Sequence, residues 1–412
     1  MTPTIVPLPG GSATSPQGFA AAAAHAGLKA DGCPDVALLV SVSSCATAGV
    51  FTRNAVRAAP VIYDQELLAE RPGRVRAVAM NARVANACTG APGLDAARAM
   101  ARAAEQAAGL PPHTALVLST GVIGAPLPVD RVARALEEAA GRLSADGGVD
   151  AAQAIMTTDT RPKHHAVRLD TPAGKITVGG IAKGAGMIHP DMATLLAVLT
   201  TDAQGEPATL APLLKRVADR SFNAISIDGD TSTNDTLLLL ANGASGVDPS
   251  RDGALWKLFE DAVLEVARTL ALAVVKDGEG ATKVLEIHVI GATTETAARE
   301  VGRAIARSTL VKTALHGGDP NWGRVLAAAG AAGVPLPVDR LSLAAAPGDG
   351  DDWLTLATGG ATAGPDLARA RDIFTQPHVR VRLDIGIGRA EAVVWTCDLS
   401  AEYVRINADY TS

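Results

Sequence analysis

One glycine-rich stretch places residues that could do chemistry directly before an apolar run. Residues 179–202 read GGIAKGAGMIHPDMATLLAVLTTD, so a turn that contains Lys183 leads to Thr194, which opens the predicted strand Leu195–Leu199. Glycines let a backbone approach another group closely, and a buried strand after the turn would fix the position of the threonine. We therefore take the Thr194 hydroxyl as the candidate reactive group.

A threonine hydroxyl is a weak nucleophile, so Thr194 needs a base to become reactive. One solution is to make the threonine the first residue of a chain, because its own α-amine can then accept the hydroxyl proton. That solution requires a cut between Ala193 and Thr194. If the preceding turn strains this bond, Thr194 Oγ1 could attack the Ala193 carbonyl, and water would open the resulting ester. On the residues alone, a plain strand residue at position 194 is the commoner case.

A second stretch could stabilise the oxyanion that such an attack creates. The predicted strand Thr114–Leu118 runs into the small residues of Ser119–Gly124, which include Thr120 and Gly121. Donors at a strand end can point at a developing negative charge. An ordinary turn explains this stretch equally well on its own.

Further polar segments lie at the ends of predicted elements. Residues 155–160 read IMTTDT, and such a cluster either satisfies its own turn, which we favour, or lines a pocket. Glu279 lies in a glycine-bounded loop between the predicted helix Leu255–Val275 and the predicted strand Val284–Ile290, a common place for binding groups. The polar run Asn223–Asn234 has acidic spacing but lacks the final Glu of a calcium-binding loop, which disfavours a metal site.

The familiar nucleotide and metal motifs are incomplete in this chain. A dinucleotide fingerprint would need a third glycine at the position of His189, and a P-loop lysine follows its glycines, whereas Lys183 precedes Gly184. His164 and His165 are adjacent, so they cannot share one face, and no cysteine or carboxylate lies at ligand spacing. We therefore expect neither a metal nor a resident cofactor.

Composition narrows the class of protein. With 412 residues the chain exceeds one ordinary core, which predicts two lobes. A hydrophobic content of 48% excludes a disordered protein, and a net charge of −6 provides no basic surface for nucleic acid. The four cysteines are scattered, which is typical of reduced cytoplasmic thiols. We expect no signal peptide and no membrane span, and therefore a cytoplasmic protein.

Helices and strands interleave without a regular βαβ repeat, so mixed α/β layers are favoured over a Rossmann sheet. The strongest further patterns predict strands at Val36–Val42, Arg74–Met80 and Thr236–Leu240, helices at Leu94–Ala108, Val129–Leu143, Leu210–Val217 and Thr294–Arg307, and a hairpin at Val167–Val178.

The C-terminal third contains the clearest strand. Val379–Ile387 alternates strictly, and a turn at Gly386–Glu391 predicts a hairpin with Ala392–Cys397. The acidic segment Ala344–Asp352, which contains Gly and Pro, predicts a surface loop. The tail Tyr403–Ser412 contains neither Lys nor Gly, and we expect it to be ordered to its last residue, unlike most termini.

Several of these motifs, in this order, resemble the ornithine acetyltransferase family of arginine biosynthesis. The resemblance covers essentially the whole chain. The segments that carry it are residues 119–124 (STGVIG), 155–160 (IMTTDT), 183–196 (KGAGMIHPDMATLL), 311–324 (VKTALHGGDPNWGR) and 407–412 (NADYTS).

The resemblance implies a layered αββα-type sandwich with a smaller α/β lobe. It also implies self-cleavage between Ala193 and Thr194 into fragments 1–193 and 194–412, which stay together as an α2β2 assembly. In the implied ping-pong reaction, Thr194 takes acetyl from N-acetylornithine, releases ornithine and passes the acetyl group to glutamate. Acetyl-CoA could be a second donor, and the resemblance implies no other cofactor.

The resemblance also implies roles for individual residues. Thr120 and Gly121 match the oxyanion hole. The residues that match the substrate-binding set are Thr157, Lys183, Thr194, Glu279, Asn407 and Ser412. These types suit an amino-acid substrate, because Lys183 can favour an anionic group and Glu279 can pair with an ammonium.

One segment departs from the family pattern. The family usually has Asn-Ser-Gly-Asn-Ala-Asn-Ala-Cys-Thr-Gly, whereas residues 81–90 read NARVANACTG. Arg83 and Val84 could therefore change the donor or the acceptor, as in a paralogue of secondary metabolism. Two different functions also stay open: a self-processing aminopeptidase or amidase that hands the acyl group to water, and a binding protein without activity.

Overall fold

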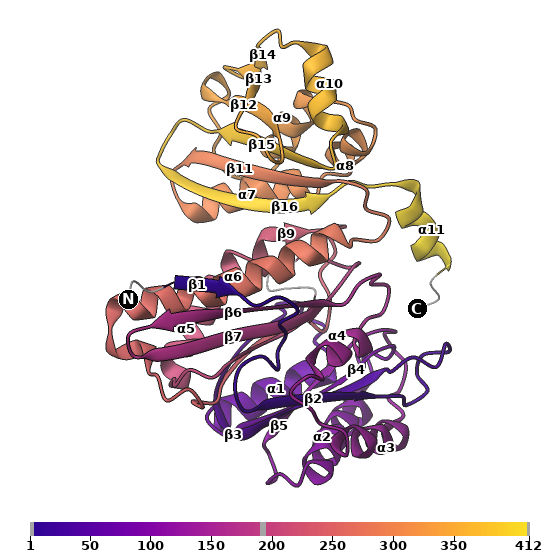
Figure 1. Cartoon of the computed structure of the whole chain (residues 1–412). Coiled ribbons are helices and arrows are strands. Elements are labelled where there is room, and N and C mark those ends of the chain that lie inside the picture. Colours follow the sequence, from indigo (N-terminus) through magenta and orange to yellow (C-terminus); the bar gives the residue numbers. More distant parts are fainter. Residues whose placement is uncertain (1–3, 190–194, 410–412) are drawn as a thin grey trace.

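The chain folds into two mixed α/β lobes, each built on one sheet (Figure 1). The structure is a computed structural model, which describes residues 4–189 and 195–409 of the chain. In Figure 1 the C-terminal lobe, coloured orange to yellow, lies above the N-terminal lobe. The predicted mixed α/β class, with a second and smaller lobe, is confirmed.

In the described residues, the sheet of the first lobe has nine strands in the order β1-β6-β7-β8-β10-β3-β4-β5, with β2 paired to β3. Their bounds are Thr4–Pro7 (β1), Phe19–Ala24 (β2), Val36–Phe51 (β3), Val75–Asn81 (β4), Ala115–Ser119 (β5), Lys163–Thr171 (β6), Gly174–Lys183 (β7), Leu196–Thr201 (β8) and Thr236–Ala241 (β10). The long strand β3 joins two parts of the sheet, because its first residues pair with β2 and β4 and its last residues, 46–51, pair with β10.

Alternating residues of the central strands divide the first lobe into layers. In β8, Leu196 and Val198 pack with β2–β5 and their helices, whereas Ala197 and Leu199 pack with α5 and α6. The two parts of the sheet that β3 joins therefore form the two inner layers, and helices form the two outer layers, as in the predicted αββα sandwich. The helices are α1 (Ala59–Glu70), α2 (Gly90–Ala107), α3 (Val129–Ala140), α4 (Gly148–Ala154), α5 (Pro207–Asp219) and α6 (Gly253–Lys276).

Seven strands form the second sheet within the described ranges, in the order β14-β13-β12-β15-β11-β16-β9. Their bounds are Ile225–Ser226 (β9), Val284–Ala292 (β11), Ser342–Pro347 (β12), Leu354–Thr358 (β13), Ala361–Thr362 (β14), His378–Asp384 (β15) and Ala390–Cys397 (β16). The helices of this half are α7 (Glu295–Ala306), α8 (Thr309–His316), α9 (Trp322–Gly330), α10 (Leu367–Thr375) and α11 (Ala401–Asp409). Short 3₁₀ turns lie at Phe222–Ala224, Pro249–Arg251 and Val338–Arg340.

The predicted hairpin between β15 and β16 is wrong, because β11 lies between these two strands. β11 pairs in parallel with β15 and antiparallel with β16. The turn after β15 crosses the end of β11, where the N–H groups of Ile387 and Gly388 donate to the Gly291 carbonyl at 2.9 and 2.8 Å. Alternation along β15 predicted its burial pattern correctly but could not identify its neighbours.

The predicted surface loop at Ala344–Asp352 is wrong in its first half. Its first four residues, up to Pro347, end strand β12, which lies between β13 and β15. The three alanines there are buried. The acidic residues that suggested a surface loop begin only at Asp349, after the strand has ended.

The predicted fragments 1–193 and 194–412 do not coincide with the two lobes. Strands β8 and β10 follow residue 194 in the sequence, yet β8 pairs with β7 and β10 pairs with β8 in the first sheet. A cut before residue 194 would therefore leave two fragments that share one sheet. None of the helices in the ranges 4–189 and 195–409 is long and apolar enough to cross a bilayer.

Candidate active site

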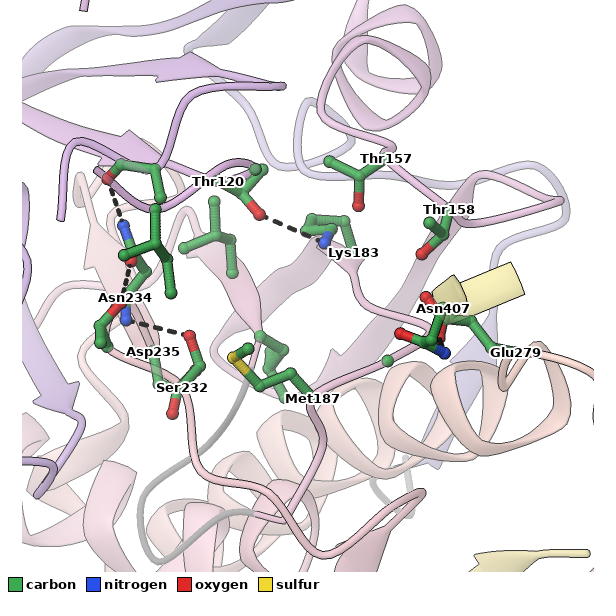
Figure 2. Close-up of a pocket in the computed structure, with 17 residues that line it drawn as sticks. Thr120, Thr157, Thr158, Lys183, Met187, Ser232, Asn234, Asp235, Glu279 and Asn407 are labelled. Carbon is green, nitrogen blue, oxygen red and sulfur yellow. Dashed lines mark hydrogen bonds between the residues drawn. The ribbon is translucent and has the colours of Figure 1, made fainter. Parts of the chain in front are cut away.

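A cavity of about 240 Å³ lies where the ends of first-lobe strands meet the loop after α6 and helix α11 (Figure 2). It is lined by segments far apart in sequence: Ala85, Thr120, Gly121, Ile123, Thr157, Thr158, Lys183, Gly186, Met187, Leu195, Leu196, Ser232, Thr233, Asn234, Asp235, Glu279 and Asn407. The residues among these that the sequence analysis assigned to a site are Thr120, Gly121, Thr157, Lys183, Glu279 and Asn407. Folding thus gathers the predicted site residues that the structure describes, although their roles stay predictions.

Three predicted positions lie outside the described residues. These are Ala193 and Thr194, on either side of the expected cut, and Ser412, the last residue of the chain. Leu195, which follows Thr194 in the sequence, lines the cavity.

Lys183 supplies a cation to the cavity. It is the last residue of β7 and pairs with Leu196 of β8, so the sheet sets its position. Its Nζ donates a hydrogen bond to Thr120 Oγ1 at 3.3 Å and lies 3.9 Å from Asp159 Oδ2. Figure 2 shows the Lys183 and Thr120 side chains joined by this bond beside Thr157.

Burial and a neighbouring carboxylate act on Lys183 in opposite directions. Burial lowers the pKa of the Lys183 ammonium below its ordinary value of 10.5, and the Asp159 carboxylate partly offsets this effect. For Asp159, burial raises the pKa, but the ammonium groups of Lys183 and Lys163 outweigh burial and hold the pKa below its usual range. The cation of the cavity is therefore backed by an ionised carboxylate.

Thr120 and Gly121 directly follow β5 and rest on the neighbouring segment after β4. The Thr120 N–H donates to the Asn81 carbonyl at 3.0 Å, so Thr120 offers its side-chain hydroxyl to the cavity. Gly121 has a φ of +130°, and a Cβ there would lie 2.1 Å from the backbone of Arg83, so no other residue fits. The Thr120 hydroxyl and the backbone of Gly121, which has no side chain, lie in a partly enclosed site and could bind an oxyanion.

Glu279 and Asn407 lie together at another side of the cavity. Glu279 is buried, and its N–H donates to the Ala185 carbonyl at 2.8 Å. Asn407, on α11, donates from Nδ2 to Glu279 Oε2 at 2.7 Å. A Cβ at Gly186 would lie 2.5 Å from the Glu279 carboxylate. The close backbone approach that the glycine-rich turn predicted is therefore confirmed, and its partner is Glu279.

The threonines after α4 have different positions, because two of them line the cavity and the third bonds to a carboxylate outside it. Thr157 and Thr158 both line the cavity. Thr160 instead donates from its N–H and its hydroxyl to the Asp277 carboxylate. The Thr157 N–H donates to Asp159 Oδ2 at 3.0 Å, so the segment satisfies its own turn and lines a pocket as well. The two interpretations that the sequence left open both hold.

Sequence reasoning did not assign the polar run before β10 to the site. The residues of this run that line the cavity are Ser232, Thr233, Asn234 and Asp235. Asn234 Nδ2 donates to the carbonyls of Ala85 and Ser119 at 2.6 and 2.8 Å, which ties the end of β5 to the segment after β4. The polar run itself was the available signal, but its acidic spacing directed attention to metals. In the described ranges, no three His, Cys, Asp or Glu side chains gather to hold a metal ion.

Arg83 and Val84, which depart from the family pattern, are not among the described residues that line this cavity. Arg83 lines a neighbouring cavity of about 340 Å³, and Thr157 borders both cavities. Val84 forms β-bridges with Thr120 and Val122. Ala85, which matches the family pattern, is the residue of this segment that reaches the site.

The cavity combines opposite charges with hydroxyl groups in a small volume. Lys183 can attract a carboxylate or a developing negative charge, and Glu279 can pair with an ammonium. The threonine hydroxyls of Thr120, Thr157 and Thr158 can donate to carbonyl oxygens. A small ligand with both a carbonyl group and a charged amine, such as an acylated amino acid, suits these groups.

Comparison with known proteins finds relatives that match nearly the whole chain. The sequence model of the ArgJ family matches residues 20–412. A protein of Symbiobacterium thermophilum named arginine biosynthesis bifunctional protein ArgJ is 46% identical over 406 residues, covering 97% of this chain and 98% of the relative. A protein of the same name from Thermotoga neapolitana is 46% identical over 397 residues, covering 96% and 99%. A solved structure of ornithine acetyltransferase complexed with ornithine, from Mycobacterium tuberculosis, is 38% identical and covers 47% of this chain and 100% of that chain, with a TM-score of 0.42.

Proposed function

The chain belongs to the ArgJ family of arginine-biosynthesis enzymes, and from this premise we propose that it moves the acetyl group of N2-acetylornithine to glutamate through an ester on Thr194. The observation that carries the proposal is that one cavity gathers Thr120, Gly121, Lys183 and Glu279. Leu195, the neighbour of Thr194 in the sequence, lines the same cavity.

The first half-reaction transfers acetyl to the enzyme. Thr194 Oγ1 attacks the acetyl carbonyl carbon, and the α-amine of Thr194 accepts the hydroxyl proton. When the tetrahedral intermediate collapses, the carbon–nitrogen bond breaks, the proton passes to the departing amine and ornithine leaves. In the second half-reaction, the neutral α-amine of glutamate attacks the ester, and the α-amine of Thr194 accepts a proton from the attacking nitrogen. As the carbon–oxygen bond breaks, that proton passes to Oγ1 and the Thr194 hydroxyl is restored.

Thr120 and Gly121 would stabilise the oxyanion of both tetrahedral intermediates. Lys183 Nζ already donates to Thr120 Oγ1, which leaves the hydroxyl hydrogen of Thr120 to donate to the oxyanion. A hydrogen bond from a cation polarises this hydroxyl and strengthens its own donation. The positive charge of Lys183 would also favour the negative intermediate directly.

Glu279 would select substrates that have an ammonium group. Asn407 donates to Oε2 of its carboxylate, and Oε1 would accept a charge-assisted bond from the side-chain amine of ornithine. Thr157 would bind the polar backbone of the amino acid, and we assign the same role to Ser412 from the family resemblance. The donor and acceptor bind in turn, so Lys183, Thr120 and Gly121 can serve both, whereas the Glu279 contact is specific to the ornithine side chain.

Self-cleavage between Ala193 and Thr194 is required to free the α-amine. Intact mass and N-terminal sequencing of purified protein should show two fragments, of which the second begins at Thr194. Thr194→Ala should remain uncut and inactive, whereas Thr194→Ser, which keeps a hydroxyl, should still be cut. A wild-type chain that is fully active and uncut would overturn the mechanism. Native mass spectrometry of the cut protein should give an α2β2 assembly.

A donor and acceptor panel tests the reaction itself. Ornithine release from acetylornithine should require glutamate, and acetylglutamate should form in equal amount. Release at the same rate without glutamate would instead identify a hydrolase of the aminopeptidase or amidase type. Acetyl-CoA with glutamate forms a separate arm, in which acetylglutamate production would establish a second donor. A folded protein that accepts no acetyl donor would support a binding role.

A further inference from the structure

Four buried charges of alternating sign lead away from the cavity. They are Lys183, Asp159, Lys163 and Asp277, here called the charge row. Lys183 Nζ lies 3.9 Å from Asp159 Oδ2, Lys163 Nζ lies 2.6 Å from Asp159 Oδ1, and Lys163 Nζ also lies 2.6 Å from Asp277 Oδ2. Each of the four side chains is at most 9% exposed.

The charge row links the strand that ends at Lys183 to the loop that contains Glu279. Lys183 ends β7 and Lys163 begins β6, and these strands are paired neighbours. Asp277 caps the end of α6, two residues before Glu279. The row therefore runs from the cation of the cavity to the loop that carries its carboxylate.

Asp159 bonds to two backbone segments that border the cavity. Besides its two lysines, its carboxylate accepts hydrogen bonds from the N–H groups of Gly184 at 2.7 Å and Thr157 at 3.0 Å. One carboxylate thus holds the backbone beside Lys183 and the backbone of a lining threonine. A buried carboxylate costs free energy unless such partners compensate for lost hydration.

We propose that Asp159 is a positioning residue, which keeps Lys183 protonated and aimed into the cavity through the charge row. The proposal rests on the proposed function in one respect, namely that Lys183 acts on the substrate or the oxyanion. Asp159 itself does not line the cavity in the described part of the chain, so it would act through Lys183.

Several other charged groups surround this pair. Those acting on Lys183, besides Asp159, are Lys163, Glu279 and Asp235. Lys29 is a further cation near Asp159. Burial lowers the pKa of Lys183, Asp159 is the largest opposing influence, and Lys163 adds to the lowering. Removing Asp159 and removing Lys163 should therefore change the pKa of Lys183 in opposite directions.

Competitive labelling with acetic anhydride measures this directly, because only the neutral amine reacts. The extent of Lys183 acetylation, read by peptide mass spectrometry across a pH series, reports the pKa of that lysine without needing enzyme activity. In Asp159→Asn, the labelling midpoint should move to lower pH by about one unit or more, the usual effect of a close opposite charge. In Lys163→Met, it should move to higher pH.

Asp202→Asn is the matched control. Asp202 is a buried carboxylate of the same lobe that accepts hydrogen bonds from the N–H groups of Thr177 and Gln17 at 2.7 and 3.1 Å. The same chemical change there should leave the midpoint of Lys183 labelling at its wild-type value. If the substitutions only loosened the structure, the midpoint of Lys183 labelling would shift in the same direction in all three variants or in none of them.

The activity arm separates this proposal from the function it rests on. The alkaline limb of kcat/KM for acetylornithine should follow the labelling midpoint in both variants. An unshifted midpoint in folded Asp159→Asn, with an active wild type, overturns the role of Asp159 alone. If Asp159→Asn does not fold, Lys163→Met provides the test. A midpoint of Lys183 labelling in Lys163→Met that equals the wild-type value, or lies at lower pH, also overturns the role of Asp159. A wild type that transfers no acetyl group overturns the proposed function, while the labelling result still stands.

Discussion

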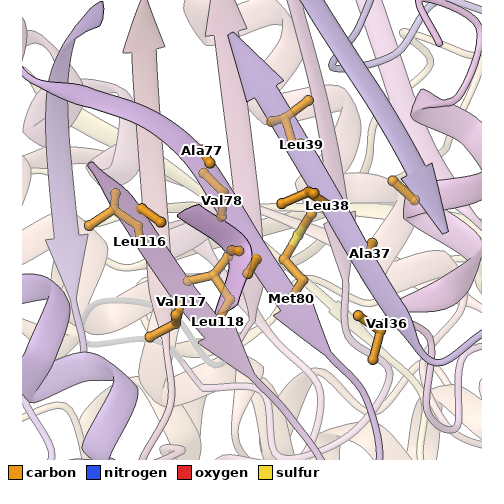
Figure 3. Packing of buried hydrophobic residues seen from close by; sticks show 14 of the residues in the cluster. Val36, Ala37, Leu38, Leu39, Ala77, Val78, Met80, Leu116, Val117 and Leu118 are labelled. Atoms are coloured by element: carbon orange, nitrogen blue, oxygen red, sulfur yellow. The ribbon is translucent and has the colours of Figure 1, made fainter. Parts of the chain in front are cut away.

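Two regions of the first lobe are both buried but are built from opposite kinds of side chain. Strands β3, β4 and β5 bury apolar runs such as Val36–Leu39 and Leu116–Leu118, whose side chains are at most 1% exposed. Figure 3 shows these residues packed across neighbouring strands. The charge row lies beside the same sandwich, with side chains at most 9% exposed.

The difference separates residues that stabilise the fold from residues that serve the site. Burying apolar surface contributes roughly 25 cal/mol per Å², whereas a buried ion pair often only balances the cost of removing its charges from water. The apolar strands therefore explain why the lobe folds. The charge row is poorly explained by stability, and its position at the cavity fits a functional requirement better.

The largest expected effect tests the apolar region. Leu116→Ala should lower the free energy of unfolding by about 2–5 kcal/mol, because Leu116 is fully buried and the cavity left behind cannot collapse completely. A urea titration measures this change, and kcat per folded molecule should stay at the wild-type value. Leu367→Ala is the control, since Leu367 is 69% exposed and its loss should cost less than about 0.5 kcal/mol. Equal urea midpoints for the two variants would contradict the comparison.

The converse change removes a charge at the cavity. Lys183→Met should lower kcat/KM by about 10- to 100-fold, the value of a charge-assisted hydrogen bond, with little change in the urea midpoint. A protonated lysine is needed, so wild-type kcat/KM should fall as pH rises through the pKa of Lys183, which lies below 10.5. The variant should lack this alkaline limb. Wild-type rates in Lys183→Met would remove the residue from the site.

A smaller effect is expected where the glycine-rich turn touches Glu279. In Gly186→Ala, the new Cβ would lie 2.5 Å from the carboxylate, so Glu279 must shift. Overpacking of this kind costs about 1–3 kcal/mol, and we expect a rise of about tenfold in KM for acetylornithine. Gly330→Ala is the matched control, because a Cβ at Gly330 meets no atom within 4 Å. An unchanged KM in Gly186→Ala would show that Glu279 does not bind the substrate ammonium.

Local patterns predicted most elements and the type of fold, but not the pairing of distant strands. The hairpin at Val167–Val178 exists because its turn and both strands are contiguous in the sequence. The predicted hairpin of β15 and β16 failed because β11, about 90 residues earlier in the chain, inserts between them. The alternation of apolar residues shows which face of a strand is buried. The same alternation is expected whichever strand lies beside it, so it cannot identify the neighbouring strand.

The residues of the site likewise include some that local patterns identified and some that they missed. Motifs identified Lys183, Thr120 and Glu279, and the fold brings them to one cavity. Several supporting contacts were missed, because they join residues more than 100 positions apart, such as Lys163 and Asp277. Asn234 is a second example, since its bonds to Ala85 and Ser119 leave no local pattern.

The smallest expected effect concerns Arg83, which belongs to neither region. Arg83 adopts a φ of +70°, a conformation that costs a residue with a Cβ about 1–2 kcal/mol. Arg83→Gly should therefore be more stable than Arg83→Ala by about 1 kcal/mol, since both lack the guanidinium and only the alanine retains the strain. Because Arg83 lines the neighbouring cavity, both variants should keep KM for acetylornithine and for glutamate within about threefold of wild type. A selective rise in KM for glutamate in both variants would instead extend the acceptor site past Thr157 into that second cavity, and would make the departure from the family pattern a specificity determinant.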